Sequence, residues 1–166
     1  MTMANWMDGQ NIAIADLMRM LPHRHPFLLI DRVVACEPGK SIRGYKNVTR
    51  VDCADDPRAI AEARAGMPVL LVLEALAQLS VVLARKTLGQ TNGDEAMFFF
   101  AGIDDARFGE AAQPGECLEL ESSVVRIMLT RGVGKFATRA TVGRRLVAEA
   151  TMIAMPARGV APGALA

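Results

Sequence analysis

A long apolar segment, residues 68–88, constrains the fold more than any other feature of this chain. A proline begins it, Gly89 ends it, and apolar side chains occupy nearly every face of the helix it would form. Polar residues interrupt the run at Glu74, Gln78 and Ser80, so it falls short of the roughly 20 apolar residues that a membrane span needs. We therefore expect a helix buried on all sides inside a globular domain.

Strand-like segments lie on both sides of this helix. Before it, a short helix over residues 12–20, which Asn11 can cap, leads into two predicted strands over residues 27–36 and 41–48. After it, the predicted strands cover residues 96–103, 117–129, 135–142 and 146–155. Consecutive antiparallel strands beside one buried helix predict an α+β fold in which the sheet wraps round the helix.

Composition narrows the class of protein. The chain has 51% apolar residues and a net charge of +1, which favours a globular protein with no nucleic-acid partner and no membrane span. Three scattered cysteines and two histidines offer little to a metal, so we expect reduced thiols, no metal, no cofactor and a cytoplasmic location. We expect one domain over residues 1–156 and a disordered tail over residues 157–166.

Glu74 is the most informative polar residue. A carboxylate inside an apolar helix costs several kcal/mol unless it is paired or protonated, so it usually has a purpose. Gln78 follows one helical turn later and shares the same face.

Six segments, in their order along the chain, resemble the 3-hydroxyacyl-acyl carrier protein dehydratases of the FabA/FabZ type. The segments are Leu-Pro-His-Arg-His-Pro-Phe-Leu-Leu-Ile-Asp-Arg (21–32), Lys-Asn-Val-Thr (46–49), Leu-Glu-Ala-Leu-Ala-Gln (73–78), residues 100–108, Pro-Gly-Glu (114–116) and Ala-Glu-Ala (148–150). The resemblance covers about residues 10–155 and implies the hotdog fold. It also implies dimers or trimers of dimers, with each site at a dimer interface where a histidine of one subunit meets a glutamate of the other.

The resemblance assigns roles to individual positions. Glu74 stands at the family's catalytic glutamate, whereas the family's catalytic histidine falls at Ile60, inside a rewritten loop over residues 55–66. We expect residues 57–65 of this loop to be helical, because Asp-Asp-Pro precedes them and a glycine follows. Besides the catalytic carboxylate, the resemblance implies these substrate-binding residues: Gln78, Pro68, Val69, Phe99, Phe100 and His23.

The resemblance implies a protein that binds or processes (3-hydroxy)acyl thioesters of acyl carrier protein in fatty acid or polyketide-type metabolism. Acid/base assistance is typically worth about 10² to 10⁴ in rate, and isoleucine cannot transfer protons, so we expect little or no dehydration by the homodimer. Three hypotheses stay open. The chain is a non-catalytic partner of an active paralogue, or an acyl thioesterase that uses Glu74, or a dehydratase whose proton donor has moved to His23 or His25. The expected partners are an acyl thioester on acyl carrier protein or coenzyme A and a second subunit, which is either identical or a paralogue.

Overall fold

The computed structural model describes residues 11–53, 66–89, 98–128 and 133–156 of the chain. Their helices are α1 (Ile14–Met20), the single 3-10 turn η2 (Arg50–Asp52) and α3 (Val69–Thr87). Their strands are β1 (Arg32–Glu37), β2 (Ser41–Asn47), β3 (Phe98–Phe108), β4 (Cys117–Met128), β5 (Val133–Val142) and β6 (Arg145–Pro156).

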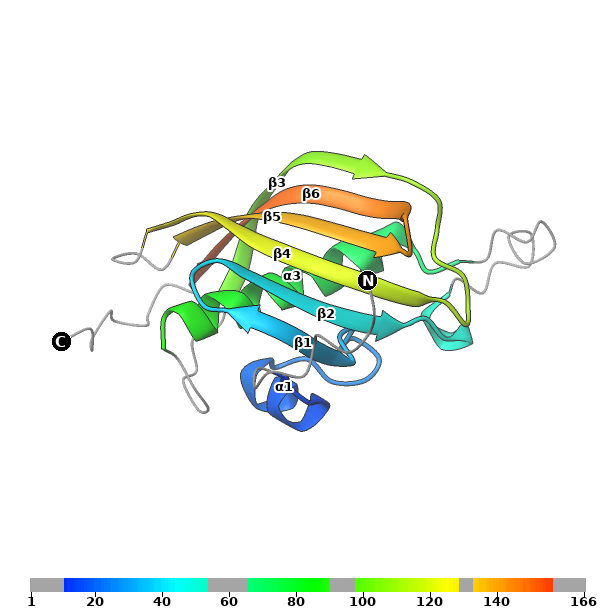
Figure 1. Ribbon diagram of the computed structural model, residues 1–166, viewed down its shortest axis with the longest axis horizontal. Coiled ribbons are helices and arrows are strands. Elements are labelled where there is room, and N and C mark those ends of the chain that lie inside the picture. Colours follow the sequence, from blue (N-terminus) through cyan, green and yellow to red (C-terminus); the bar gives the residue numbers. More distant parts are fainter. Residues whose placement is uncertain (1–10, 54–65, 90–97, 129–132, 157–166) are drawn as a thin grey trace.

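The strands form one antiparallel six-stranded sheet in the order β1-β2-β4-β5-β6-β3. Figure 1 shows α3 lying across one face of this sheet, while β1 and β3 form its two opposite edges. The predicted α+β fold is therefore confirmed, with the sheet curled round a long helix as the hotdog resemblance implies.

Burial of α3 explains why the sheet must curl. Val72 and Leu76 are fully buried and Leu73 is only 7% exposed, as expected for a helix that is apolar all round. The sheet supplies the matching surface because alternate residues of β4 and β5 point inward, among them Leu118, Leu120, Phe136 and Ala140. A flat sheet could cover only one side of the helix, whereas a curled sheet covers most of its circumference.

Close packing between β2 and α3 requires a glycine. A Cβ atom at Gly44 would lie 2.9 Å from the main-chain oxygen of Arg32 and 3.2 Å from the side chain of Leu79. The absence of a side chain there lets the strand approach the helix closely. The helix also contacts β4 through a polar pair, in which the hydroxyl groups of Ser80 on α3 and Ser122 on β4 lie 2.8 Å apart.

Two element boundaries before α3 differ from the sequence prediction, for a physical reason in each case. The first helix begins at Ile14 rather than at residue 12, because the main chain of Ile12 pairs with Val33 as an isolated bridge. The first strand begins at Arg32 rather than at residue 27, because the preceding main chain forms hydrogen bonds with a side chain of α3 described below. Tertiary contacts decide both boundaries.

The edge strand β3 is longer than predicted and runs on to Phe108. Among the described strands it pairs only with β6, and its exposed side chains include Phe99, Ile103 and Phe108. The other predicted strands agree with the structure to within about two residues at their ends.

Parts of the sequence prediction lie outside the described residues. These are the helical turn over residues 57–65, the isoleucine at position 60 and the tail over residues 157–166. No helix within the described ranges is long and apolar enough to cross a membrane.

Candidate functional site

The α1–β1 loop (residues 21–31) brings a histidine to α3. Arg24 holds this loop, since its guanidinium donates hydrogen bonds to the carbonyl groups of Met18 (2.9 Å), Leu21 (2.9 Å) and His23 (2.7 Å). The carbonyls at a helix C-terminus lack partners within the helix, so a cation that binds them stabilises the helix end. Arg24 therefore closes the end of α1 and fixes the backbone at His23.

The start of α3 is anchored on the turn that precedes β4. The amide of Met67 donates to the carbonyl of Ala112 at 2.8 Å, and a Cβ atom at Gly66 would lie only 2.7 Å from that same oxygen. The turn is itself held by Arg145, whose guanidinium donates to the Glu116 carboxylate at 2.6 Å. These contacts fix the position at which the helix begins.

Glu74 and Gln78 lie one turn apart on α3 and are joined by a hydrogen bond. The Gln78 Nε2 group donates to Glu74 Oε1 at 2.9 Å and to the carbonyl of Phe27 at 2.6 Å. The amide of Leu29 donates to Gln78 Oε1 at 3.0 Å. We call this set of three hydrogen bonds the Gln78 clamp, and it ties the carboxylate of α3 to the α1–β1 loop.

His23 approaches the same carboxylate oxygen. Its Nε2 atom lies 3.4 Å from Glu74 Oε1, and the two side chains are 34% and 37% exposed. Its Nδ1 atom is buried and has no hydrogen-bond partner among the described residues. Of the two neutral tautomers, the one with its proton on Nε2 fits this arrangement better, because a proton on Nδ1 would be a buried donor with no partner among the described residues.

The structure separates the two histidines of the chain. His25 is exposed, and within the described residues no contact joins it to Glu74. The arrangement thus contains one imidazole beside one carboxylate, both from the same subunit. A pair of this kind can exchange a proton with a bound molecule.

Two exposed apolar side chains lie on the elements that carry this site. Leu70 precedes Glu74 by one helical turn and is 72% exposed, and Phe27 on the facing loop is 57% exposed. Large apolar side chains with this much exposure suit contact with an acyl chain or with a second subunit.

The other residues that the resemblance assigns to the site occupy two places. Pro68 is the N-cap of α3 and Val69 is its first residue, and both are half-buried. Phe99 and Phe100 lie on the edge strand β3, where Phe99 is 51% exposed and Phe100 packs against the core. No contact within the described residues joins them to the carboxylate of α3, and position 60 lies outside those residues.

Sequence reasoning assigned no role to a buried charge cluster beside the site. Lys46 is 6% exposed, and its Nζ atom lies 3.0 Å from Asp52 Oδ2, 3.0 Å from the carbonyl of Asn47 and 3.9 Å from Asp31 Oδ1. Burial alone would raise the pKa of Asp52, but hydrogen bonds from Thr49 and Lys46 together hold that pKa below its ordinary value. Inward alternation along β2 was the available signal, because it turns the lysine toward the core.

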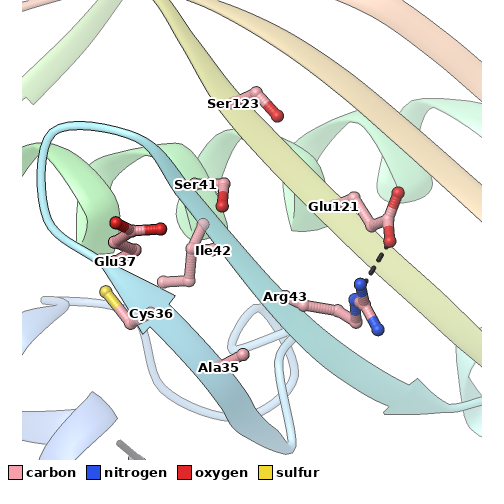
Figure 2. Close-up of a pocket in the computed structure, with 8 residues that line it drawn as sticks. All are labelled: Ala35, Cys36, Glu37, Ser41, Ile42, Arg43, Glu121 and Ser123. Carbon is pink, nitrogen blue, oxygen red and sulfur yellow. Dashed lines mark ion pairs between the residues drawn. The ribbon is translucent and has the colours of Figure 1, made fainter.

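The structure also has a surface pocket, which is not lined by Glu74 or His23. Its volume is about 480 Å³, and Figure 2 shows it over β1, β2 and β4, with Arg43 and Glu121 paired at 3.0 Å. Its lining residues are Ala35, Cys36, Glu37, Ser41, Ile42, Arg43, Glu121 and Ser123. The pocket shares no residue with the Gln78 clamp or with His23, so neither Glu74 nor His23 lines it.

The described part of the chain contains no group of three His, Cys, Asp or Glu side chains that could hold a metal ion.

The chain is similar to known proteins along most of its length. The family model described as "FabA-like domain" matches residues 21–151. The 3-hydroxyacyl-[acyl-carrier-protein] dehydratase FabZ of Dechloromonas aromatica is 41% identical over 142 residues, which cover 84% of this chain and 94% of that protein. FabZ of Albidiferax ferrireducens is 40% identical over 148 residues, covering 88% of this chain and 95% of that protein.

Solved structures agree on the fold. The dehydratase heterocomplex ApeI:P from Xenorhabdus doucetiae contains a chain that superposes with a TM-score of 0.66 at 16% identity. The superposition covers 87% of this chain and 92% of that one. The match to the family model and the identity to the FabZ proteins together show that this chain belongs to the FabA-like family of dehydratases.

Proposed function

We propose that this protein binds 3-hydroxyacyl thioesters of acyl carrier protein in fatty acid biosynthesis, and that Glu74 is the carboxylate that meets the acyl group. The single observation behind this proposal is the partly exposed Glu74 carboxylate, which the Gln78 clamp holds near the beginning of a helix whose middle is buried. The FabZ relatives, named as dehydratases of these thioesters, support the choice of substrate class.

Dehydration requires two proton transfers. One group removes a proton from the carbon next to the thioester carbonyl, and another group protonates the hydroxyl that leaves. Ile60 stands at the position of the family's histidine and can do neither. We therefore expect the homodimer to bind the substrate and to dehydrate it far more slowly than a protein with the complete pair.

His23 supports a second candidate function, a dehydratase with a relocated proton donor. Its Nε2 atom lies 3.4 Å from Glu74, and no other histidine lies near that carboxylate in the described structure. In this mechanism Glu74 accepts the carbon-bound proton, and the Nε2–H of His23 supplies a proton to the leaving hydroxyl.

The assembly is part of the proposal. The edge of β3 that no other described strand pairs with, together with the exposed phenylalanines of this strand, supports pairing between two subunits, which would extend the sheet. A second copy of this chain gives a homodimer that contains Glu74 twice. A paralogue with the family's histidine would instead complete one site, because this chain supplies the carboxylate.

Assays with two substrates test the proposal. The purified protein is mixed with 3-hydroxyacyl and plain acyl thioesters of acyl carrier protein, and binding and products are followed by mass spectrometry. Binding of the hydroxyacyl form that weakens in Glu74→Gln supports the proposal, whereas failure to bind either thioester contradicts it. Hydrolysis of the plain thioester that disappears in Glu74→Gln would establish a thioesterase in its place.

His25 provides a matched control for the second candidate. Dehydration that is lost in His23→Ala and kept in His25→Ala would establish the relocated donor. Equal rates in both variants would exclude it.

A further inference from the structure

The turn over residues 109–116, which we call the β3–β4 turn, connects two strands and also contacts the start of α3. Its Ala112 carbonyl accepts a hydrogen bond at 2.8 Å from the amide of Met67, two residues before the helix begins. Its Glu116 carbonyl accepts another at 2.9 Å from the amide of Val48, directly after β2. The position of this turn therefore fixes where α3 begins relative to the sheet.

Arg145, the first residue of β6, binds this turn at three places. Its Nη1 group donates to the carbonyls of Glu110 at 3.1 Å and Ala111 at 3.0 Å, and its Nη2 group donates to Glu116 Oε2 at 2.6 Å. The same carboxylate oxygen accepts from the amide of Gln113 at 2.7 Å. A guanidinium offers its donors in one rigid plane, so it can hold these acceptors in a fixed arrangement that an ammonium group cannot.

Ala112 lies between the residues that Arg145 binds, and its surroundings leave little room for movement. Its side chain is fully buried, and a Cβ atom at Gly66 would lie 2.7 Å from its carbonyl oxygen. A shift of the turn must therefore either move the beginning of α3 or break the hydrogen bond from Met67. The side chain of Arg145 is 28% exposed, so it contributes to the site through the turn rather than from inside the core.

We propose that Arg145 is a positioning residue for the thioester site, because it holds the β3–β4 turn and thereby sets the position of the first turns of α3. This inference rests on the proposed function, in which the acyl thioester meets Glu74, the sixth residue of that helix. Loss of the three hydrogen bonds from Arg145 leaves the beginning of α3 less ordered, and binding must then restore that order at a cost in affinity.

Hydrogen exchange tests the positioning without any substrate. Arg145→Met keeps an apolar stem and removes all three hydrogen bonds, and we expect the Met67 amide to exchange about 10-fold faster or more, with amides between β4 and β5 unchanged. Arg145→Lys keeps a charge near Glu116 without the planar fork, so it should lie between this variant and the wild type. It also serves if Arg145→Met does not fold.

Arg139→Met is the matched control. It removes the same charge from the same sheet, but Arg139 pairs with Glu149 of β6, at 3.7 Å, rather than with the turn. The Met67 amide should therefore exchange at the wild-type rate in this variant. A difference between the two methionine variants cannot come from net charge.

Binding tests whether the position of α3 matters to the site. The affinity of each variant for a 3-hydroxyacyl thioester of acyl carrier protein is measured by surface plasmon resonance, which needs no turnover. We expect Kd to rise about 3- to 10-fold in Arg145→Met, to rise less in Arg145→Lys and to stay unchanged in Arg139→Met.

The outcomes separate this proposal from the proposed function. Unchanged exchange at Met67 in the Arg145 variants would overturn the positioning role, and a weaker Kd with unchanged exchange would show that Arg145 contacts the ligand directly instead. Faster exchange with an unchanged Kd would also overturn it. A wild-type protein that binds no thioester refutes the proposed function, and exchange at Met67 then still decides whether Arg145 holds the start of α3.

Discussion

Replacement of Asp52 by asparagine tests how much the buried charge cluster beside the site stabilises the fold. Asparagine keeps the shape and can still accept a hydrogen bond from Thr49, so the main loss is the ion pair with Lys46 at 3.0 Å. The Lys46 and Asp52 side chains are only 8% and 10% exposed, so the pair resembles a buried ion pair more than an ion pair on the surface.

The size of the expected loss in unfolding free energy depends on the contacts that the Lys46 ammonium group retains in the variant. Breaking a buried pair typically costs 3–5 kcal/mol, roughly, but here the ammonium retains the Asn47 carbonyl at 3.0 Å and Asp31 at 3.9 Å. We therefore expect Asp52→Asn to lower the free energy of unfolding by about 1–3 kcal/mol at pH 7. For a domain of this size, each kcal/mol lowers Tm by about 2–4 °C.

The effect depends on pH with a defined sign. The folded state holds the pKa of Asp52 below its ordinary value of 3.8, so the stabilisation is fully present above that value. It is lost as the pH falls through the lower, folded-state pKa. The difference between wild type and Asp52→Asn should therefore be largest at neutral pH and should shrink below about pH 4.

Urea unfolding at fixed protein concentration, at pH 7 and at pH values down to about 3, provides the assay. Asp16→Asn is the control, because Asp16 pairs with Arg19 at 2.7 Å but both side chains are more than half exposed. That exposed pair should contribute at most about 1 kcal/mol. If Asp52→Asn proves no less stable than Asp16→Asn, or if its deficit does not change with pH, the reasoning is refuted.

Three further changes test other parts of the structure. Leu76→Ala should lower the free energy of unfolding by about 2–5 kcal/mol, because the side chain is fully buried in α3; a loss below about 1 kcal/mol in urea unfolding would contradict the packing. Burial raises the pKa of both the Cys36 and the Cys117 thiol, but Cys117 is exposed and Cys36 is only 5% exposed, so a thiol reagent should modify Cys117 first, as peptide mapping would show; the reverse order would contradict this difference in exposure. Arg24→Ala should broaden or shift the imidazole resonances of His23, since it removes the three hydrogen bonds that hold the loop; an unchanged spectrum would show that the loop does not depend on them.

The main elements of the fold could be predicted from the sequence because they depend on local patterns. Apolar residues all round one segment and alternation in the others indicated α3 and the strands, and their bounds were right to within about two residues except at the start of β1 and the end of β3. The start of β1 was wrong because residues 27–29 use their main-chain groups to bind Gln78, a partner about 50 positions away that no local pattern encodes.

In the candidate site, too, only the features that depend on local sequence patterns could be predicted. The spacing of Glu74 and Gln78 predicts a shared helix face, and the structure joins them by a hydrogen bond. The approach of His23 to that carboxylate depends on how the α1–β1 loop folds back on α3, so the sequence left both histidines open as candidates. Alternation along β2 indicated that the Lys46 side chain points inward, but no local pattern indicated which carboxylates it pairs with.

The Gln78 clamp has a consequence for the order in which the molecule assembles. Gln78 binds residues that precede it by 49 and 51 positions, so the loop with His23 is placed only after the chain between them has closed on α3. Closing a chain segment of that length costs conformational entropy, and contacts within α1 alone do not compensate for this cost. Protection of the Leu29 amide that is weaker than protection of amides in the sheet and the central helix would therefore show that this closure opens while those elements stay folded.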